Sequence, residues 1–370
     1  MLDVTIATHG EMAGGSTDDR LLAGALASAG ACVQLSVWND PDVDWSQSRR
    51  IVIRSTWDYH LDPLGWFRWL SAASSVSRVI NDSGVVRWNS DKRYLLDLEG
   101  AGVPIVPTQL ATRDRPVDLA GLCVARGWRD IVVKPAIGAS ARGAERFTDA
   151  AVTARGGPAQ AHLDALLIHG HALIQPFQEA VNDARERSLV YIGGAFSHAF
   201  TKPPFLSGVG DGLGEQPHEP GTAERLLAEH ALESVPGAVT YARVDVVPTR
   251  DGPRLMELEL IEPDLGLRLS PDSAVALARA ILARLLAAFA ISNAGDGYGI
   301  LPIMDAVQKI TVGISSELLA KAQRASGAGI TETVRTGLQL VAASEAYARL
   351  HQLRGKVRFS RSAADLKADR

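Results

Sequence analysis

The sequence predicts an α/β protein with more than one domain, and three observations lead to this prediction. The chain has 370 residues, which is longer than one hydrophobic core normally supports. Short β-like runs alternate with helical patterns near the N-terminus, as is typical of βαβ units. The Gly-rich polar segment 292–302 precedes a basic C-terminal part. Residues 303–370 carry eleven Lys and Arg against six Asp and Glu, whereas the rest of the chain carries 27 Lys and Arg against 36 Asp and Glu. Such asymmetry indicates a body and an appendage with different roles.

Composition excludes several classes of protein. Hydrophobic residues make up 46% of the chain and charged residues 22%, which is the balance of a globular protein. Cys32 and Cys123 form no CxxC motif, which excludes a disulfide framework and a cysteine-rich zinc site. The first residues lack the regions of a signal peptide. Arg279 and Arg284 interrupt the apolar stretch 274–291, so we expect a buried helix there rather than a membrane span, and a cytoplasmic protein without a membrane partner.

The N-terminal elements follow from the spacing of apolar residues. The expected strands are Val4–Ala7, Cys32–Trp38 and Arg50–Arg54, and the expected helices are Asp19–Ala29, Pro63–Ala73 and Asp91–Ala101. Asp18 and Asp19 are expected to cap the first helix. Pro104 and Pro107 indicate that Val103–Val106 is an edge strand or a linker.

A different region begins near residue 120. Ile131–Lys134 predicts a strand that ends in a lysine and is followed by the small-residue loop Ala136–Gly143. The remaining expected elements are the strands Ala172–Gln175 and Ser188–Ile192, a hairpin of Tyr241–Val247 and Arg254–Ile261 joined by Pro248–Pro253, and a helix over Ser273–Ala290 that closes the body.

Lys134 and the loop after it have the composition of a phosphate-binding site. A flexible Gly/Ala/Ser loop lets backbone amides approach phosphate oxygens, and the ammonium group acts as a point charge. The loop is not a Walker A loop, because the chain contains no GxxxxGK[ST] motif. A lysine that ends a strand is more often solvent-exposed than a phosphate ligand, so this feature alone leaves both interpretations open.

The predicted hairpin carries three carboxylates. Glu257 and Glu259 alternate on one strand and therefore point to the same face, and Asp245 on the partner strand can join them. Three oxygen donors would suit Mg²⁺. Leu258 and Leu260 occupy the opposite face. If that face is core, the carboxylates point either into solvent or into a cleft, and the sequence alone leaves both possibilities open.

As a set, these segments resemble the ATP-grasp carboxylate–amine ligases over roughly residues 1–290. The resemblance is carried by NSDKRYLLDLEGAGVPIVPT (89–108), VVKPAIGASARG (132–143), LIQPF (173–177), ERSLVYIGGAFSHAFTKPP (186–204), and YARVDVVP with LMELELIEP (241–263). Within that family, RSTWDYH (54–60), WNSDKRYLLDL (88–98) and ELELIEP (257–263) resemble the cyclo-ligases that form D-cycloserine from O-ureido-D-serine.

The resemblance implies an ATP-grasp fold with further parts at both ends. The implied parts are a Rossmann-like pre-ATP-grasp domain over 1–88, an ATP-grasp domain with a small and a large lobe over 89–291, a linker over 292–302, and a C-terminal module over 303–370.

The resemblance also implies ATP and Mg²⁺ as cofactors and a role for each matching residue. The implied nucleotide ligands are Lys92 and Lys134 on the phosphates, Gln175, Pro176 and Phe177 as the hinge that pairs with adenine, and Glu186 as an acidic contact. The implied metal ligands are Asp245, Glu257 and Glu259, and the implied catalytic cations are Lys202 near the γ-phosphate and Arg243 on the transferred phosphoryl group. Glu259 departs from the family's usual pattern, in which an Asn takes this place.

The family's reaction explains these residue types. A substrate carboxylate attacks the γ-phosphate to give an acyl phosphate, which an amine then displaces. Phosphoryl transfer depends on positioning and charge neutralisation, so no protein nucleophile is needed. The resemblance therefore implies a carbon–nitrogen ligase that acts on a small amino-acid-like substrate.

The third expected N-terminal strand ends in residues suited to such a substrate, at the edge where α/β sheets usually bind ligands. Arg54 can clamp a carboxylate and Asp58 can hold an ammonium group, with Trp57 between them. An Arg–Asp pair that only ties down a loop explains the same residues equally well.

Residues 303–370 resemble a ribbon-helix-helix antitoxin of the VapB type. Ile310, Val312 and Ile314 alternate on one face of an expected strand. The strand–helix–helix unit that begins with this strand, about 40 residues long, is too small to bury its apolar faces alone. We therefore expect a homodimer through this ribbon, with DNA or a toxin as a further partner. Gly313 offers no side chain that could read a base, so contact with DNA phosphates and dimerisation alone both stay open.

The sequence is therefore consistent with two functions of different classes. The first is an ATP-dependent ligase with a dimerising, DNA-binding or toxin-binding tail. The alternative is a DNA-binding antitoxin or transcriptional regulator whose ATP-grasp body senses a ligand. The complete set of lysines and carboxylates favours the ligase, because a sensor need not keep every metal ligand.

Overall fold

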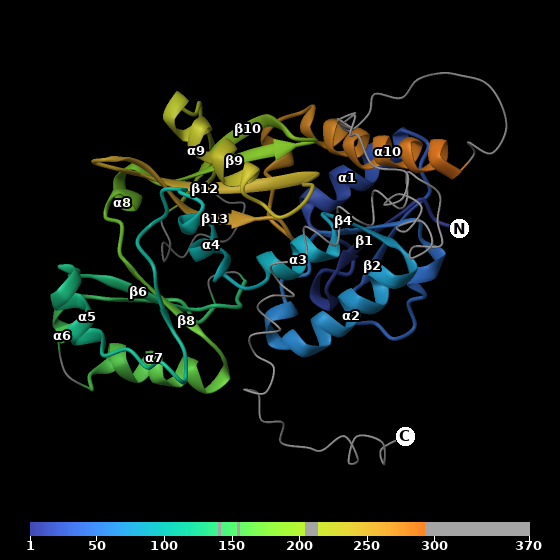
Figure 1. The fold of residues 1–370 in the computed structure, drawn as a ribbon. Helices are drawn as coiled ribbons and strands as arrows, with labels where there is room; N and C mark the ends of the chain where they lie inside the picture. Colours follow the sequence, from blue (N-terminus) through green and yellow to red (C-terminus); the bar gives the residue numbers. More distant parts are fainter. Residues whose placement is uncertain (140–141, 154–155, 204–213, 293–370) are drawn as a thin grey trace, which may run out of the picture. The chain divides into compact units, whose positions relative to one another are not determined.

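A computed structural model of the protein describes residues 1–139, 142–153, 156–203 and 214–292. Three β-sheets with helices packed on them make up this part of the chain (Figure 1). The mixed α/β class expected from the sequence is confirmed for these residues.

The first sheet is parallel, as the βαβ pattern predicts, with the strand order β2-β1-β3-β4. Its elements are the strands β1 (Val4–Thr8), β2 (Val33–Val37), β3 (Arg50–Ile53) and β4 (Arg78–Ile80) and the helices α1 (Thr17–Ser28), α2 (Pro63–Val76) and α3 (Ser83–Asn89). The strands β1 and β3 are buried along their whole length. Leu22 of α1 shares an apolar cluster with Ile6, and Trp66 of α2 shares another with Ile53. The strand order reverses at β1 and β3, and such a switch point is where α/β sheets usually bind ligands.

Local capping explains where the first helices begin. Ser16 Oγ accepts from the amide of Asp19, whose carboxylate accepts from the amide of Ser16, so α1 starts with a capping box. At the start of α2, the Asp62 carboxylate accepts from the amide of Gly65 at 2.9 Å, and Pro63 occupies the first helical position. Asp19 therefore has the predicted capping role.

The second sheet is antiparallel, with the order β5-β8-β6-β7. Its elements are β5 (Gln109–Ala111), β6 (Ile131–Pro135), β7 (Glu145–Phe147) and β8 (Ala172–Pro176), with the helices α5 (Leu119–Arg126), α6 (Asp149–Thr153) and α7 (Pro158–His169). Val133 and Ile174 on one face pack in a cluster with Leu163 of α7. Because strand residues alternate in direction, Lys134 and Gln175 lie on the other face.

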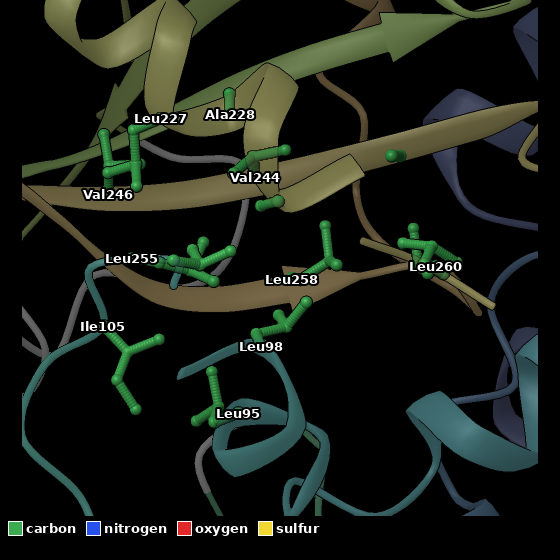
Figure 2. Packing of buried hydrophobic residues seen from close by; sticks show 14 of the residues in the cluster. Leu95, Leu98, Ile105, Leu227, Ala228, Val244, Val246, Leu255, Leu258 and Leu260 are labelled. Carbon is green, nitrogen blue, oxygen red and sulfur yellow. The ribbon is translucent and has the colours of Figure 1, made fainter. Parts of the chain in front are cut away.

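The third sheet is also antiparallel, with the order β11-β10-β9-β12-β13. Its strands are β9 (Glu186–Ile192), β10 (Ala195–Lys202), β11 (Gln216–Pro217), β12 (Tyr241–Thr249) and β13 (Gly252–Glu259), and the neighbouring helices are α4 (Tyr94–Gly100), α8 (Ala180–Ala184) and α9 (Thr222–Glu233). Figure 2 shows Leu98 of α4, Leu227 of α9, Val246 and Leu258 in one apolar cluster with these strands. The face with Leu258 and Leu260 is therefore core.

The hairpin turn is shorter than expected. The ladder continues through a pair between Pro248 and Pro253, and Thr249 pairs with Gly252. The Thr249 hydroxyl donates to the carbonyl of Gly252 at 2.6 Å, which closes a two-residue turn. Val103–Val106 is not a regular strand; it pairs with the edge of β13 through the amide of Val106 and the carbonyl of Leu255 at 2.8 Å.

The helix α10 (Ser273–Ser292) follows as predicted. Leu277 and Ile281 share the cluster of Leu26 in α1, and the two helices lie together in Figure 1. Within the described ranges, no helix is long and apolar enough to cross a membrane.

The described residues belong to one compact unit, Met1–Gly297. The expected boundary between residues 88 and 89 falls inside α3, which runs to Asn89. Residues 293–302 of the expected linker and the ribbon-helix-helix module over 303–370 lie outside the described residues, so these parts stay predictions.

Candidate active site

One face of the β12–β13 hairpin carries the predicted carboxylates. Asp245 pairs with Glu257 across the two strands, and Arg243 pairs with Glu259. Paired residues of antiparallel strands share a face, while Leu258 lies in the core on the other side. The common face predicted for the three carboxylates is therefore confirmed.

Two lysines from distant segments meet at Glu257. Lys92, just before α4, donates its Nζ to Oε2 of Glu257 at 2.9 Å, and Lys134 of β6 donates its Nζ to Oε1 at 2.7 Å. The side chains of Lys92, Lys134 and Glu257 are 17%, 10% and 20% exposed. Burial would raise the pKa of Glu257, but Lys134 and Lys92 outweigh it and hold that pKa well below its usual range. The structure thus brings together both predicted phosphate lysines.

A second charged group lies on the same sheet face. Lys202 of β10 contacts the carboxylate of Glu186 and donates to Oδ2 of Asp245 at 2.8 Å. Asp245 also accepts from the Ser188 hydroxyl at 2.7 Å and from Nε of Arg243 at 3.0 Å. Burial opposes ionisation of Asp245, but Arg243 and Lys202 lower its pKa, so it stays charged. Burial raises the pKa of Glu186 to about 7, although Lys202 counteracts it.

Arg243 connects this group to Glu259 and to the segment after β13. Its Nη2 donates to Oε1 of Glu259 at 2.5 Å, and its Nη1 donates to the carbonyl of Asp264 at 2.9 Å. A fully engaged guanidinium has a fixed orientation, so Arg243 is held in place before any ligand binds.

The carboxylates suit Mg²⁺ in type but are engaged by cations. In the described part of the chain, no group of three or more His, Cys, Asp or Glu side chains is arranged to hold a metal ion. Asp245, Glu257 and Glu259 each contact a lysine or an arginine instead. Carboxylate oxygens are the donors that Mg²⁺ prefers, so the donor set fits this ion provided that those contacts give way.

The predicted hinge lies at the end of β8, in the sheet β5-β8-β6-β7, which we call the small sheet. Gln175 is 5% exposed and donates its Nε2 to the hydroxyl of Thr108 at 2.8 Å. Pro176 ends β8, and the amide of Phe177 donates to the carbonyl of Asp130 at 2.8 Å. The Phe177 amide is therefore bonded within the protein, and an adenine that paired with it would replace this bond.

Sequence reasoning missed Arg146, which lies beside the hinge. Its Cζ lies 3.6 Å from the centre of the Phe177 ring, and its Nη2 donates to Oδ2 of Asp130 at 2.6 Å. Arg146 belongs to β7, a three-residue strand with no clear alternation of its own. The only available signal was its place shortly after a candidate phosphate loop.

The predicted substrate residues are separated in the structure. Arg54 is 2% exposed and donates to the carbonyl of Pro263 at 2.8 Å. Its Nε lies 3.5 Å from Oδ1 of Asp19. Asp58 accepts instead from the indole of Trp38 at 2.6 Å. Arg54 thus has aspartate partners, but they are Asp19 and, at 3.9 Å, Asp18 rather than Asp58.

Trp57 and Asp18 anchor the segment after β13 on the first sheet. The Trp57 indole donates to the carbonyl of Glu262 at 3.0 Å. The carboxylate of Asp18 accepts from the amides of Leu265 and Leu267 at 2.9 and 3.0 Å. Sequence reasoning treated Asp18 only as a helix cap, because a contact across 247 residues has no local signal.

Known proteins resemble this chain over most of their own length. The family described as the N-terminal domain of D-cycloserine synthetase DcsG matches residues 4–81. The cycloserine biosynthesis protein DcsG of Streptomyces lavendulae is 32% identical over 279 residues, which cover 70% of this chain and 91% of that protein.

Solved structures agree with this relationship. The crystal structure of D-cycloserine synthetase DcsG matches with a TM-score of 0.71 and 30% identity, over 76% of this chain and 99% of that one. The ATP-grasp ligase PsnB, complexed with a precursor variant, Mg and ADP, matches with a TM-score of 0.54 over 77% of this chain and 99% of its own; at 13% identity this likeness concerns the fold alone.

The ATP-grasp fold expected from the sequence is therefore confirmed for the part of the chain that these structures match. Identity of 32% with coverage of 91% of the relative extends the likeness beyond the fold. This chain belongs to the DcsG family of ATP-grasp ligases.

Proposed function

We propose that the protein is an ATP- and Mg²⁺-dependent ligase that activates a substrate carboxylate as an acyl phosphate for attack by an amine. The observation that supports this most strongly is the meeting of Lys92 and Lys134 at Glu257. Two ammonium groups from separate segments converge on one partly buried carboxylate. Polyphosphate oxygens could replace that carboxylate as the partners of the two lysines.

The nucleotide would be held between the face of the small sheet that carries Lys134 and the face of the five-stranded sheet that carries Glu257. The residues proposed for it are Lys92 and Lys134 for the phosphates, Gln175, Pro176 and Phe177 for the base, and Glu186 for an acidic contact. Lys134 and Gln175 lie on the same face of the small sheet, which supports a common ligand.

Asp245, Glu257 and Glu259 would hold Mg²⁺ through carboxylate oxygens. When bound, the ion would neutralise charge on the phosphate oxygens. The proposal is supported by the shared face of the three carboxylates and by the lowered pKa of Asp245 and Glu257, which keeps both charged near neutral pH.

Arg243 and Lys202 are the proposed catalytic cations. Arg243 is 7% exposed and bonded to Asp245 and Glu259, so its charge is oriented in advance. Oriented charges cost no reorganisation when negative charge moves during phosphoryl transfer. The substrate carboxylate would attack the γ-phosphate directly, and the amine would then displace the phosphate from the carbonyl carbon.

The substrate would lie at the ends of β1 and β3. Trp57 and Asp58 are the proposed contacts. Arg54, which was proposed from the sequence as a third contact, is 2% exposed and would instead help to position Trp57, since both donate to carbonyls of the segment after β13. The synthesis of D-cycloserine, for which the similar proteins are named, supports an amino-acid-like substrate such as O-ureido-D-serine. With the amine in the same molecule, the reaction would be a cyclisation.

Residues 303–370 would serve as a dimerisation module that also contacts DNA or a toxin. Their excess of five positive charges and the alternation of Ile310, Val312 and Ile314 in the sequence support this proposal.

Thermal unfolding of the full chain with Mg-ATP tests the nucleotide site. The melting temperature should rise with nucleotide concentration. Lys134→Ala should abolish this rise. Arg129→Ala, which removes an exposed arginine shortly before β6, should retain it. ADP release over a panel of amino acids should then identify the substrate. A melting temperature that does not respond to Mg-ATP in the parent would contradict the proposal.

A further inference from the structure

The guanidinium group of Arg146 covers the ring of Phe177. The distance of 3.6 Å from Cζ to the ring centre equals a van der Waals contact between two flat groups, so the guanidinium lies over the ring face. By comparison, Arg126 lies 5.9 Å from the centre of the Trp128 ring, a loose contact on the surface of α5.

Arg146 lies on the face of the small sheet that carries the phosphate lysine. Val132 pairs with Arg146 on one side and with Gln175 on the other, so these three share a face. Lys134 is two residues from Val132 on the same strand and therefore also lies on that face. From there its ammonium group reaches Glu257.

Asp130 holds the stack in place from two directions. Its carboxylate accepts from Arg146, and its carbonyl accepts from the amide of Phe177. The Arg146 side chain is nevertheless 32% exposed. One side of the guanidinium is thus covered by Phe177, and part of the group stays accessible.

We propose that Arg146 forms the platform on which the purine base of the nucleotide stacks. This inference rests on the proposed nucleotide site and adds the residue that selects the base. A guanidinium is flat and weakly hydrated, and it stacks readily on π systems. Because stacking grows with overlap, the platform favours a purine over a pyrimidine.

Calorimetric titration of the full chain with Mg²⁺ and three ligands tests the platform: ADP, UDP and inorganic tripolyphosphate. Arg146→Ala and Arg146→Lys should each raise the Kd for ADP about tenfold, as expected for the loss of one base stack. Both should leave the Kd for tripolyphosphate within about twofold, and the preference for ADP over UDP should shrink. Arg146→Lys keeps the charge and can keep the contact with Asp130, so it separates stacking from charge.

Arg126→Ala is the control, because it removes an arginine that only loosely contacts an aromatic ring, Trp128, and it should change none of the three affinities. If the Arg146 variants bind ADP and tripolyphosphate equally more weakly, Arg146 acts through charge or folding and the stacking proposal is wrong. Unchanged ADP binding in both Arg146 variants would also overturn the proposal. A parent protein that binds tripolyphosphate and ADP equally well would also overturn it. A parent that binds neither would instead overturn the proposed function itself.

Discussion

Individual side chains in the site are charged, largely or partly buried, and paired with opposite charges. Glu257 lies between two lysines, and Asp245 lies between Lys202 and Arg243. Removing one partner of such a buried pair leaves the other charge uncompensated, which costs about 3–5 kcal/mol. Glu257→Gln should therefore destabilise the fold as well as impair activity, so it is a poor test of catalysis.

Glu259→Gln is a cleaner test. Its side chain is 28% exposed, and Arg243 keeps Asp245 as a partner when Glu259 is neutralised. We expect turnover to fall roughly a hundredfold, as for the loss of one electrostatic contact to the transition state, with a change in stability of about 1 kcal/mol or less. Steady-state kinetics and thermal unfolding measure the two effects. A variant with parental turnover would show that Glu259 is not a functional ligand.

Glu262 makes the stability depend on pH. Burial, together with Glu259, raises the pKa of Glu262 to about 8. A folded-state pKa above the unfolded value means that the contribution of Glu262 is fully present below about pH 4 and is lost as the pH rises through about 8.

Glu262→Gln cannot titrate, so its free energy of unfolding should fall less than that of the parent between pH 5 and pH 9. The difference should be roughly 1 kcal/mol or more, since one pKa unit corresponds to about 1.4 kcal/mol. Urea unfolding at both values measures it. The exposed Glu11→Gln serves as control, and parallel curves for parent and Glu262→Gln would refute the prediction.

Elements with a clear alternation of residues were predictable, and those defined by tertiary contacts were not. The strands β1, β6 and β12 match expectation closely because they are apolar and bounded by turn residues. The strand β10 was missed, although Gly193 and Gly194, both with positive φ, form the kind of two-glycine turn that indicates a hairpin. The strand β7 has three residues, too few for any period to appear.

Asn89 shows how one element is held by another. Its Nδ2 donates to the carbonyl of Leu258 at 2.8 Å, and its Oδ1 accepts from the amide of Leu260 at 2.9 Å. Asn89→Ala should cost about 2–4 kcal/mol, because two buried backbone groups at the edge of β13 lose their partners. Urea unfolding measures this, with the exposed Asn39→Ala as control. A loss below about 0.5 kcal/mol would mean that water or a shifted side chain replaces these bonds.

For the whole molecule, sequence reasoning identified the family and the set of lysines and carboxylates, because these residues occur in order within recognisable segments. The common face of Asp245, Glu257 and Glu259 followed from the predicted hairpin and from strand alternation. The environment of Arg54 did not, since Asp19 and Pro263 approach it from the first helix and from the segment after β13. Contacts of that range depend on how the sheets pack, and no local pattern encodes them.

The basic C-terminal segment should be separable from the ligase. A fragment of residues 1–302 keeps every proposed site residue, so it should retain ATP-coupled ligation at close to the parental rate. Without Ile310, Val312 and Ile314 it should no longer dimerise. Light scattering and an ADP-release assay on the fragment check both points. A folded but inactive fragment would show that the segment belongs to the catalytic unit. A fragment with the same number of chains per particle as the full-length protein would contradict dimerisation through this segment.

In the proposed reaction, a substrate carboxylate attacks the γ-phosphate of ATP. Oxygen-18 placed in the carboxylate of the substrate that stimulates ADP release should appear in the inorganic phosphate, one labelled oxygen for each product formed, because the acyl phosphate passes that oxygen to phosphate when the amine displaces it. Mass spectrometry of the phosphate measures the transfer. Phosphate that carries no label while product accumulates would contradict acyl-phosphate activation and the catalytic roles proposed for Arg243 and Lys202.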